Sequence, residues 1–192
     1  MSLALSAVRA QAIRAVISYG LRLRRRSPDT DRSQVRALLE HHLDGQLDPS
    51  CTVRSIYGEL FPLLEWMDPD WAARHVESVF PMDQGQRMLL DAAWDAYLTG
   101  GQLTEKTWTL LAGTYTVMVE RMNPSKQDRV GSFLASQLGA HLISRLWHGL
   151  WVPKTFATWV DSRETPPLGA CARCRRAGLH LAVRAMIFGL WA

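Results

Sequence analysis

The sequence predicts an all-α protein, an antiparallel stack of helices that is either HEAT-like or an irregular helical repeat. Apolar residues recur at steps of three and four up to about residue 150, and no stretch shows the alternation typical of strands. Pro, Gly and Asp divide this pattern into segments of about 12–24 residues, which favours short loops between antiparallel neighbours. Segments 31–67 and 68–99 each have about the 30–45 residues of a two-helix repeat unit.

The first two predicted helices span residues 3–25 and about 33–44. Ser27-Pro28-Asp29 ends the first, Asp31 or Ser33 caps the second, and Gly45 ends it. The predicted inward residues of the first are Leu5, Val8, Ala12, Val16, Tyr19 and Leu23, opposite Arg14, Ser18, Arg22 and Arg25. Those of the second are Val35, Leu38, Leu39 and Leu43.

Stop and start signals define the helices that follow. A third helix is predicted to open at Asp48-Pro49 and run to Met67, with a kink or break at Pro62. Asp68-Pro69-Asp70 starts a fourth, which Phe80-Pro81 ends. The remaining helices are predicted at 84–99, which Gly100-Gly101 ends, from Thr104 with Thr107 to Met122, and at about 126–150. Trp66, Trp71, Trp94 and Trp108 are the predicted core tryptophans.

These signals predict one helical repeat-like domain, residues 1–152, followed by a linker at 153–170 that contains Pro166-Pro167. Residues 171–192 are basic and then apolar. We expect either a C-terminal helix or a non-native tail from a truncated or shifted reading frame.

Positive charge is concentrated at the two ends of the chain. Residues 1–36 carry eight Arg and two Asp, whereas residues 37–170 carry ten basic and 16 acidic residues. Arg22, Arg24, Arg25 and Arg26 are the densest basic cluster and could contact phosphate. Three cysteines form no secretory disulfide framework, and no apolar run reaches the length of a membrane span. We therefore expect a cytoplasmic protein.

Motifs for catalysis or metal binding are incomplete. Cys171-x-x-Cys174, even with His180, lacks a fourth zinc ligand, and Glu40-His41-His42 lacks the metalloprotease spacing. His141 and His148 share a face with Arg145 between them, which disfavours a metal. Asp91 and Asp95 resemble a solvated charge ladder with Arg87. Neither a phosphate-binding GxxxxGK[ST] loop nor a GxSxG elbow occurs, so we expect no enzyme and no cofactor.

Three phrases carry a resemblance to a known group of proteins: VRAQAIRAVISYGL, VRSIYGELFPLLEWMDPDWAARHVESVFP and AAWDAYL. They resemble the helical C-terminal regions of large bacterial multidomain proteins that carry NTPase or Sir2-like modules and are associated with defence against phage. The resemblance covers roughly residues 8–122. It implies a helical region that senses or scaffolds, and it supplies no catalytic residues.

The sequence thus favours a non-enzymatic protein-interaction module, a fragment or subunit of a larger bacterial defence-type protein. The alternative is a nucleic-acid-associated helical protein that uses the N-terminal Arg cluster. A tryptophan left partly exposed would be a natural anchor for a protein partner. The identity of the partner and the oligomeric state stay open.

Overall fold

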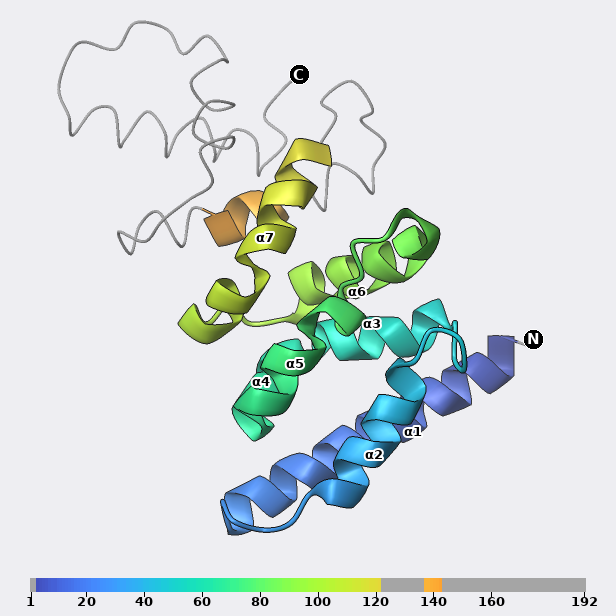
Figure 1. Ribbon diagram of the computed structural model, residues 1–192, viewed down its shortest axis with the longest axis vertical. Helices are drawn as coiled ribbons and strands as arrows, with labels where there is room; N and C mark the ends of the chain where they lie inside the picture. The colour runs from blue at the N-terminus through green and yellow to red at the C-terminus, as the bar shows by residue number, and fades with distance from the viewer. Residues whose placement is uncertain (1–2, 122–136, 143–192) are drawn as a thin grey trace, which may run out of the picture. The chain divides into compact units, whose positions relative to one another are not determined.

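The computed structural model describes residues 3–121 and 137–142, with side chains from residue 7 onward (Figure 1). All regular secondary structure in these ranges is helical, which confirms the predicted all-α class. The elements are α1 (Leu3–Arg26), α2 (Ser33–Leu43), α3 (Cys51–Glu59), α4 (Phe61–Met67), α5 (Pro69–Val79), the 3-10 turn η1 (Gln84–Gln86), α6 (Arg87–Gly100) and α7 (Glu105–Arg121).

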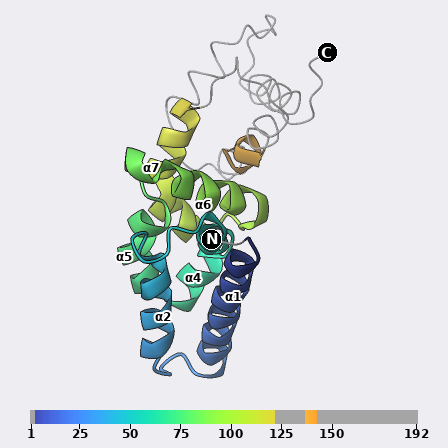
Figure 2. The same cartoon turned by 90° about the vertical axis from the view of Figure 1, so that its right-hand side faces the viewer.

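The chain divides into two compact units, Met1–Leu111 and Ala112–Ala192, and α7 spans the boundary. In the first unit α1 and α2 form an antiparallel pair, visible in both views (Figures 1 and 2). Helix α3 packs against both α1 and α6 and is the centre of this unit.

The inward face of α1 differs from the predicted one. Ala10, Ile13, Ile17 and Gly20 are buried, whereas Val8 and Tyr19 are 66% and 58% exposed. At Gly20 the reason is close approach, since an added Cβ would lie 2.4 Å from Met67 Sδ of α4. Of the side chains that suggested the other face, Ala12 is also exposed, whereas Val16 and Leu23 are half-buried. The side chain of Leu5 lies outside the described set.

Residue Leu60 separates α3 from α4, so the predicted break near Pro62 is confirmed. Pro62 lies in the first turn of α4, where its missing N–H leaves no hydrogen bond unmade. The start of α3 differs slightly from the prediction. Ser50, not Asp48, caps it by accepting a hydrogen bond from Val53 N at 3.3 Å.

The predicted start and stop of α5 are both confirmed. Asp68 accepts a hydrogen bond from Trp71 N at 3.1 Å and also pairs with Arg36 of α2. The helix ends at Val79, directly before Phe80-Pro81. Asp68 therefore both caps α5 and fastens it to α2.

Helix α6 buries the six side chains predicted for it: Leu89, Leu90, Ala93, Trp94, Tyr97 and Leu98. It lies against α3 at a glycine, since a Cβ on Gly58 would be 1.9 Å from Ala93 O. This is the most extensive helix pair of the described residues. Phe80 packs edge-on against Phe61, Trp94 and Tyr97, and so joins the end of α5 to this core.

Buried polar side chains of α3 satisfy carbonyl groups at the ends of other helices. Arg54 is 2% exposed and donates to the carbonyls of Leu43, at 2.9 Å, and Ser78. Those carbonyls lie at the C-termini of α2 and α5, where the helix itself supplies no donor. Tyr57 donates its hydroxyl to Leu39 O at 2.8 Å. Helix α3 thus holds two neighbouring helices through hydrogen bonds as well as through apolar contact.

Thr104 and Thr107 begin α7 as predicted, because each accepts a hydrogen bond from the other's backbone N–H. The helix buries Trp108, Leu111, Tyr115 and Val119, while Met118 is half-buried. Residues 137–142 are helical, within the range predicted for the last long helix. The predicted linker 153–170 and tail 171–192 lie outside the described residues.

None of the helices in the described ranges is long and apolar enough to cross a membrane.

Candidate functional site

Nine arginines of the first unit fall into two groups, while Arg74 and Arg87 make only local contacts on their own helices. The first group is bound internally: Arg9 pairs with Asp48 at 3.1 Å, Arg14 with Glu59, and Arg36 with Asp68. Arg32 and Arg54 donate to backbone carbonyls. These side chains take part in contacts that hold the helices together.

The second group is the predicted cluster Arg22, Arg24, Arg25 and Arg26. Within the described residues, none of these four guanidinium groups forms an ion pair with a carboxylate. They occupy the last turns of α1, where the helix dipole favours positive charge. That preference explains why cations are tolerated here without partners, and it also leaves them free to meet an external anion.

Trp66 lies beside this cluster rather than in the core. It is 45% exposed, so its predicted core position is wrong, whereas Trp71, Trp94 and Trp108 are buried as predicted. The guanidinium carbon of Arg25 lies 6.0 Å from the centroid of the Trp66 ring, at the outer range of a cation–π contact. Leu63, one helical turn earlier on α4, is also 41% exposed.

These residues make one surface, which we call the Arg–Trp surface. Its members are the exposed residues Tyr19, Arg22, Arg25 and Arg26 of α1 and Leu63 and Trp66 of α4, and the contact of Arg25 with Trp66 joins the two helices. Residues three or four apart are neighbours on a helix, which connects Tyr19, Arg22, Arg25 and Arg26 along α1. Arg24 belongs to the opposite side of α1 and is half-buried. The sequence cluster therefore divides, and three of its four arginines lie on this surface.

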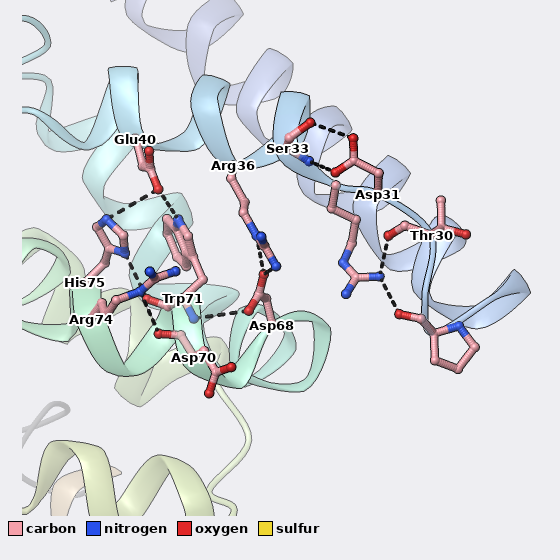
Figure 3. Close-up of polar contacts among 12 residues, drawn as sticks. Thr30, Asp31, Ser33, Arg36, Glu40, Asp68, Asp70, Trp71, Arg74 and His75 are labelled. Carbon is pink, nitrogen blue, oxygen red and sulfur yellow. Dashed lines mark hydrogen bonds and ion pairs between the residues drawn. The ribbon is translucent and has the colours of Figure 1, made fainter.

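The other polar clusters of the first unit are explained by packing. Figure 3 shows Glu40 of α2 reaching α5, where it accepts a hydrogen bond from the Trp71 indole at 3.1 Å and lies 3.6 Å from His75 Nε2. His42 Nδ1 lies 3.0 Å from Asp48, which is buried and also meets Arg9. Glu40 and His42 therefore serve packing contacts, whereas His41 is exposed.

Metal and redox sites gain no support in the part of the chain that the structure covers. Residues 3–121 and 137–142 contain no group of three or more His, Cys, Asp or Glu side chains that could hold a metal ion. Cys51 is a free cysteine whose thiol lies 3.7 Å from Met88 O. Cys171, Cys174, His148 and His180 lie outside the described residues.

A hollow of about 700 Å³ lies among the segments that follow α2 and α5. Its lining includes His75, Asp44, Glu77 and Asp83. Asp91 and His141, two of the residues considered for chemistry, do not line it. His141 instead lies 2.7 Å from the Tyr115 hydroxyl in the second unit, and burial lowers the pKa of its imidazole to about 4.

Asp91 and Asp95 share a face of α6, as their spacing predicts, and Asp91 lies 3.8 Å from Arg87. Partial burial raises the pKa of Asp95 to about 6, and the neighbouring charge of Asp91 adds to the rise. Arg87 is exposed and Asp91 is about half exposed, so this pair resembles the predicted charge ladder more than an acid–base site.

The raised pKa of Asp95 makes the stability of the protein depend on pH. Its carboxyl group binds a proton more tightly in the folded chain than in the unfolded chain, whose value is 3.8. Its contribution to stability therefore falls as the pH rises from about 4 to about 6. We expect Asp95→Asn to raise the free energy of unfolding by about 1 kcal/mol at pH 7, after allowance for solvent screening. Urea unfolding at pH 7 and below pH 4 measures this; a variant less stable at pH 7 would contradict it.

No protein-family model matches the sequence, and neither the curated proteins nor the solved structures include a significant match to it.

Reasoning from the sequence found the basic cluster but missed its aromatic neighbour. Tyr19 was the one aromatic residue recognised beside the arginines. Trp66 follows Arg25 by 41 residues and comes next to it only through packing of α4 on α1. In the sequence, Leu63 and Trp66 are three residues apart on the short segment after Phe61-Pro62. This spacing could have indicated that the two side chains lie next to each other on one side of a helix.

Proposed function

We propose that this chain is a non-enzymatic interaction module that binds a partner protein through the Arg–Trp surface. One observation carries the proposal: Trp66 is 45% exposed beside Arg25, which forms no ion pair among the described residues, whereas Trp71, Trp94 and Tyr97 of α5 and α6 are buried. Trp and Arg are enriched among residues that dominate the free energy of protein association. A neighbouring aliphatic side chain, Leu63, extends the apolar contact.

The test is co-purification of partners with the full-length chain and with Trp66→Ala, compared by quantitative mass spectrometry. We expect at least one partner whose recovery falls about tenfold or more with Trp66→Ala, because loss of an anchor residue costs about 2 kcal/mol or more. Met88→Ala on α6 is the matched control, since Met88 is 72% exposed and should leave recovery unchanged. Equal recovery with both variants would contradict the proposal.

A second candidate is a nucleic-acid-associated protein, and the pairing of Arg25 with Trp66 favours it. Arginine and an aromatic ring side by side can hold a phosphate and stack on a base. An electrophoretic shift assay against salt tests this candidate. A shift that weakens steeply with salt and is lost when Arg22, Arg24, Arg25 and Arg26 are all changed to Ala would support it.

We also propose, from the sequence resemblance, that the module acts within a larger bacterial defence-type protein as a region or a subunit. The genomic neighbourhood tests this proposal. A neighbouring frame for an NTPase or Sir2-like module would support it, and a neighbourhood with no such frame would count against it.

A further inference from the structure

We infer that the ligand of the Arg–Trp surface is an acidic peptide segment of the partner, in which carboxylates flank an apolar side chain. The inference rests on the proposed function and adds the chemistry of the partner to it. Three properties of the surface lead to this chemistry: its unpaired charge, its apolar pair and the acidic character of the chain around it.

The positive charge of the Arg–Trp surface favours an anionic ligand. Arg22, Arg25 and Arg26 are exposed, lie within one turn of each other and have no carboxylate partner among the described residues. A guanidinium group binds a carboxylate through two parallel hydrogen bonds, and it is less strongly hydrated than an ammonium group. Two or three carboxylates spaced along a peptide would therefore match the three arginines.

The apolar pair, Leu63 and Trp66, favours a ligand with an apolar side chain over a nucleotide. Leu63 and Trp66 are three residues apart, so they lie next to each other on the exposed side of α4. A base can stack on Trp66, but Leu63 offers no hydrogen bond to a base or a phosphate. An aliphatic or aromatic side chain of a peptide would bury area against both residues.

The charge of the remaining described chain disfavours a long polyanion. Apart from Arg22, Arg24, Arg25 and Arg26, residues 3–111 carry eight basic and 14 acidic residues, a net charge of −6. A nucleic acid presents one phosphate after another and would meet this negative charge wherever it extended beyond α1. Single-strand binding also uses a series of stacked aromatic side chains, whereas the surface has Trp66 and Tyr19. A short acidic segment fits the limited size of the basic cluster.

The experiment titrates the full-length chain into fluorescein-labelled peptides and follows fluorescence anisotropy. The first peptide has Leu and Phe three residues apart and flanked by glutamates. The second replaces the glutamates with Gln, and the third replaces Leu and Phe with Ser. A single-stranded oligonucleotide of the same length serves as the competing class. We expect the first peptide to bind with a Kd of about 1–100 µM and each altered peptide to bind about tenfold more weakly.

Variants of the chain identify the surface. Trp66→Ala and the triple charge reversal Arg22→Glu, Arg25→Glu, Arg26→Glu should each weaken the first peptide about tenfold or more. Met88→Ala and Arg74→Glu are the matched controls, since both side chains are exposed on other helices, and they should leave the Kd unchanged. Circular dichroism checks that each variant remains helical.

Each other result overturns the inference. Equal binding of the Gln peptide would remove the role of carboxylates, and equal binding of the Ser peptide would remove that of the apolar pair. Tighter binding of the oligonucleotide, with loss in the charge-reversed variant, would assign the surface to nucleic acid. If no peptide binds but recovery of a partner still depends on Trp66, the proposed function stands and the acidic chemistry is wrong.

Discussion

Replacing Gly58 with Ala is expected to destabilise the first unit by about 3 kcal/mol or more, enough to unfold a marginally stable domain. The added Cβ would lie 1.9 Å from Ala93 O and 2.6 Å from the carbonyl carbon of the same residue. Both atoms belong to the backbone of α6, so no side chain can rotate away. The two helices must separate, and the packing of Trp94 and Tyr97 would be loosened with them.

Helix propensity alone predicts the opposite result, because Ala stabilises a helix interior by about 1 kcal/mol relative to Gly. A loss of stability in Gly58→Ala would therefore come from the contact with α6. Gly113→Ala in α7 is the matched control, since nothing lies within 4 Å of its added Cβ. We expect that variant to be as stable as the parent or slightly more stable. Urea unfolding followed by circular dichroism measures both, and a Gly58→Ala chain as stable as the parent would contradict the close contact of α3 with α6.

Arg54→Met is expected to lower the free energy of unfolding by about 3 kcal/mol. The substitution preserves much of the apolar stem but removes both hydrogen bonds that Arg54 donates. The buried carbonyl of Leu43 would then lack a donor, and the last turns of α2 and α5 would lose a common partner. Burial lowers the pKa of the Arg54 guanidinium group, which is the direction expected for a desolvated cation.

Two further variants separate the hydrogen bonds from the charge. Arg54→Lys retains a cation but cannot reach two carbonyls with one planar fork, so we expect it to be destabilised as well. Arg87→Met removes an exposed arginine, whose side chain is 69% accessible, and should change stability by about 0.5 kcal/mol or less. Equal stability of Arg54→Met and Arg87→Met would show that the carbonyl contacts of Arg54 contribute little.

Local signals in the sequence predicted the helix ends better than the packed faces. The Asp68-Pro69 start, the Phe80-Pro81 stop and the break near Pro62 each depend on a few adjacent residues, and all three are confirmed. The core of α6 was also predicted in full, because its apolar residues occupy one side of the helix.

The inward face of α1 could not be chosen from periodicity. Its sequence, LALSAVRAQAIRAVISYGLRLRRR, has apolar residues on several sides, so more than one stripe satisfies steps of three and four. The choice is made by close approach of other helices at Ala10 and Gly20, which depends on residues far along the chain. The same holds for Arg14, predicted on the outer face, which pairs with Glu59 of α3.

At the candidate site, one feature could be predicted from the sequence and another could not. The arginine cluster is contiguous in the sequence and was found there, whereas its pairing with Trp66 requires the packing of α4 on α1. The sequence places Trp66 in the core because large apolar residues are usually buried. Helix α4 is short, however, and it buries Phe61, Leu64 and Met67 on one side, which leaves Leu63 and Trp66 outside.

The close contact of Gly58 with Ala93 also bears on the order in which the chain can fold. Helix α3 is synthesised before α6, yet α6 is its most extensive neighbour. Until α6 has been made, the α3 surface around Gly58 has no cover from its main partner. The contact joins residues far apart in the chain, and such contacts slow folding because a long loop must close first. Burial of this part of α3 is therefore complete only after Trp94 and Tyr97 of α6 have been synthesised.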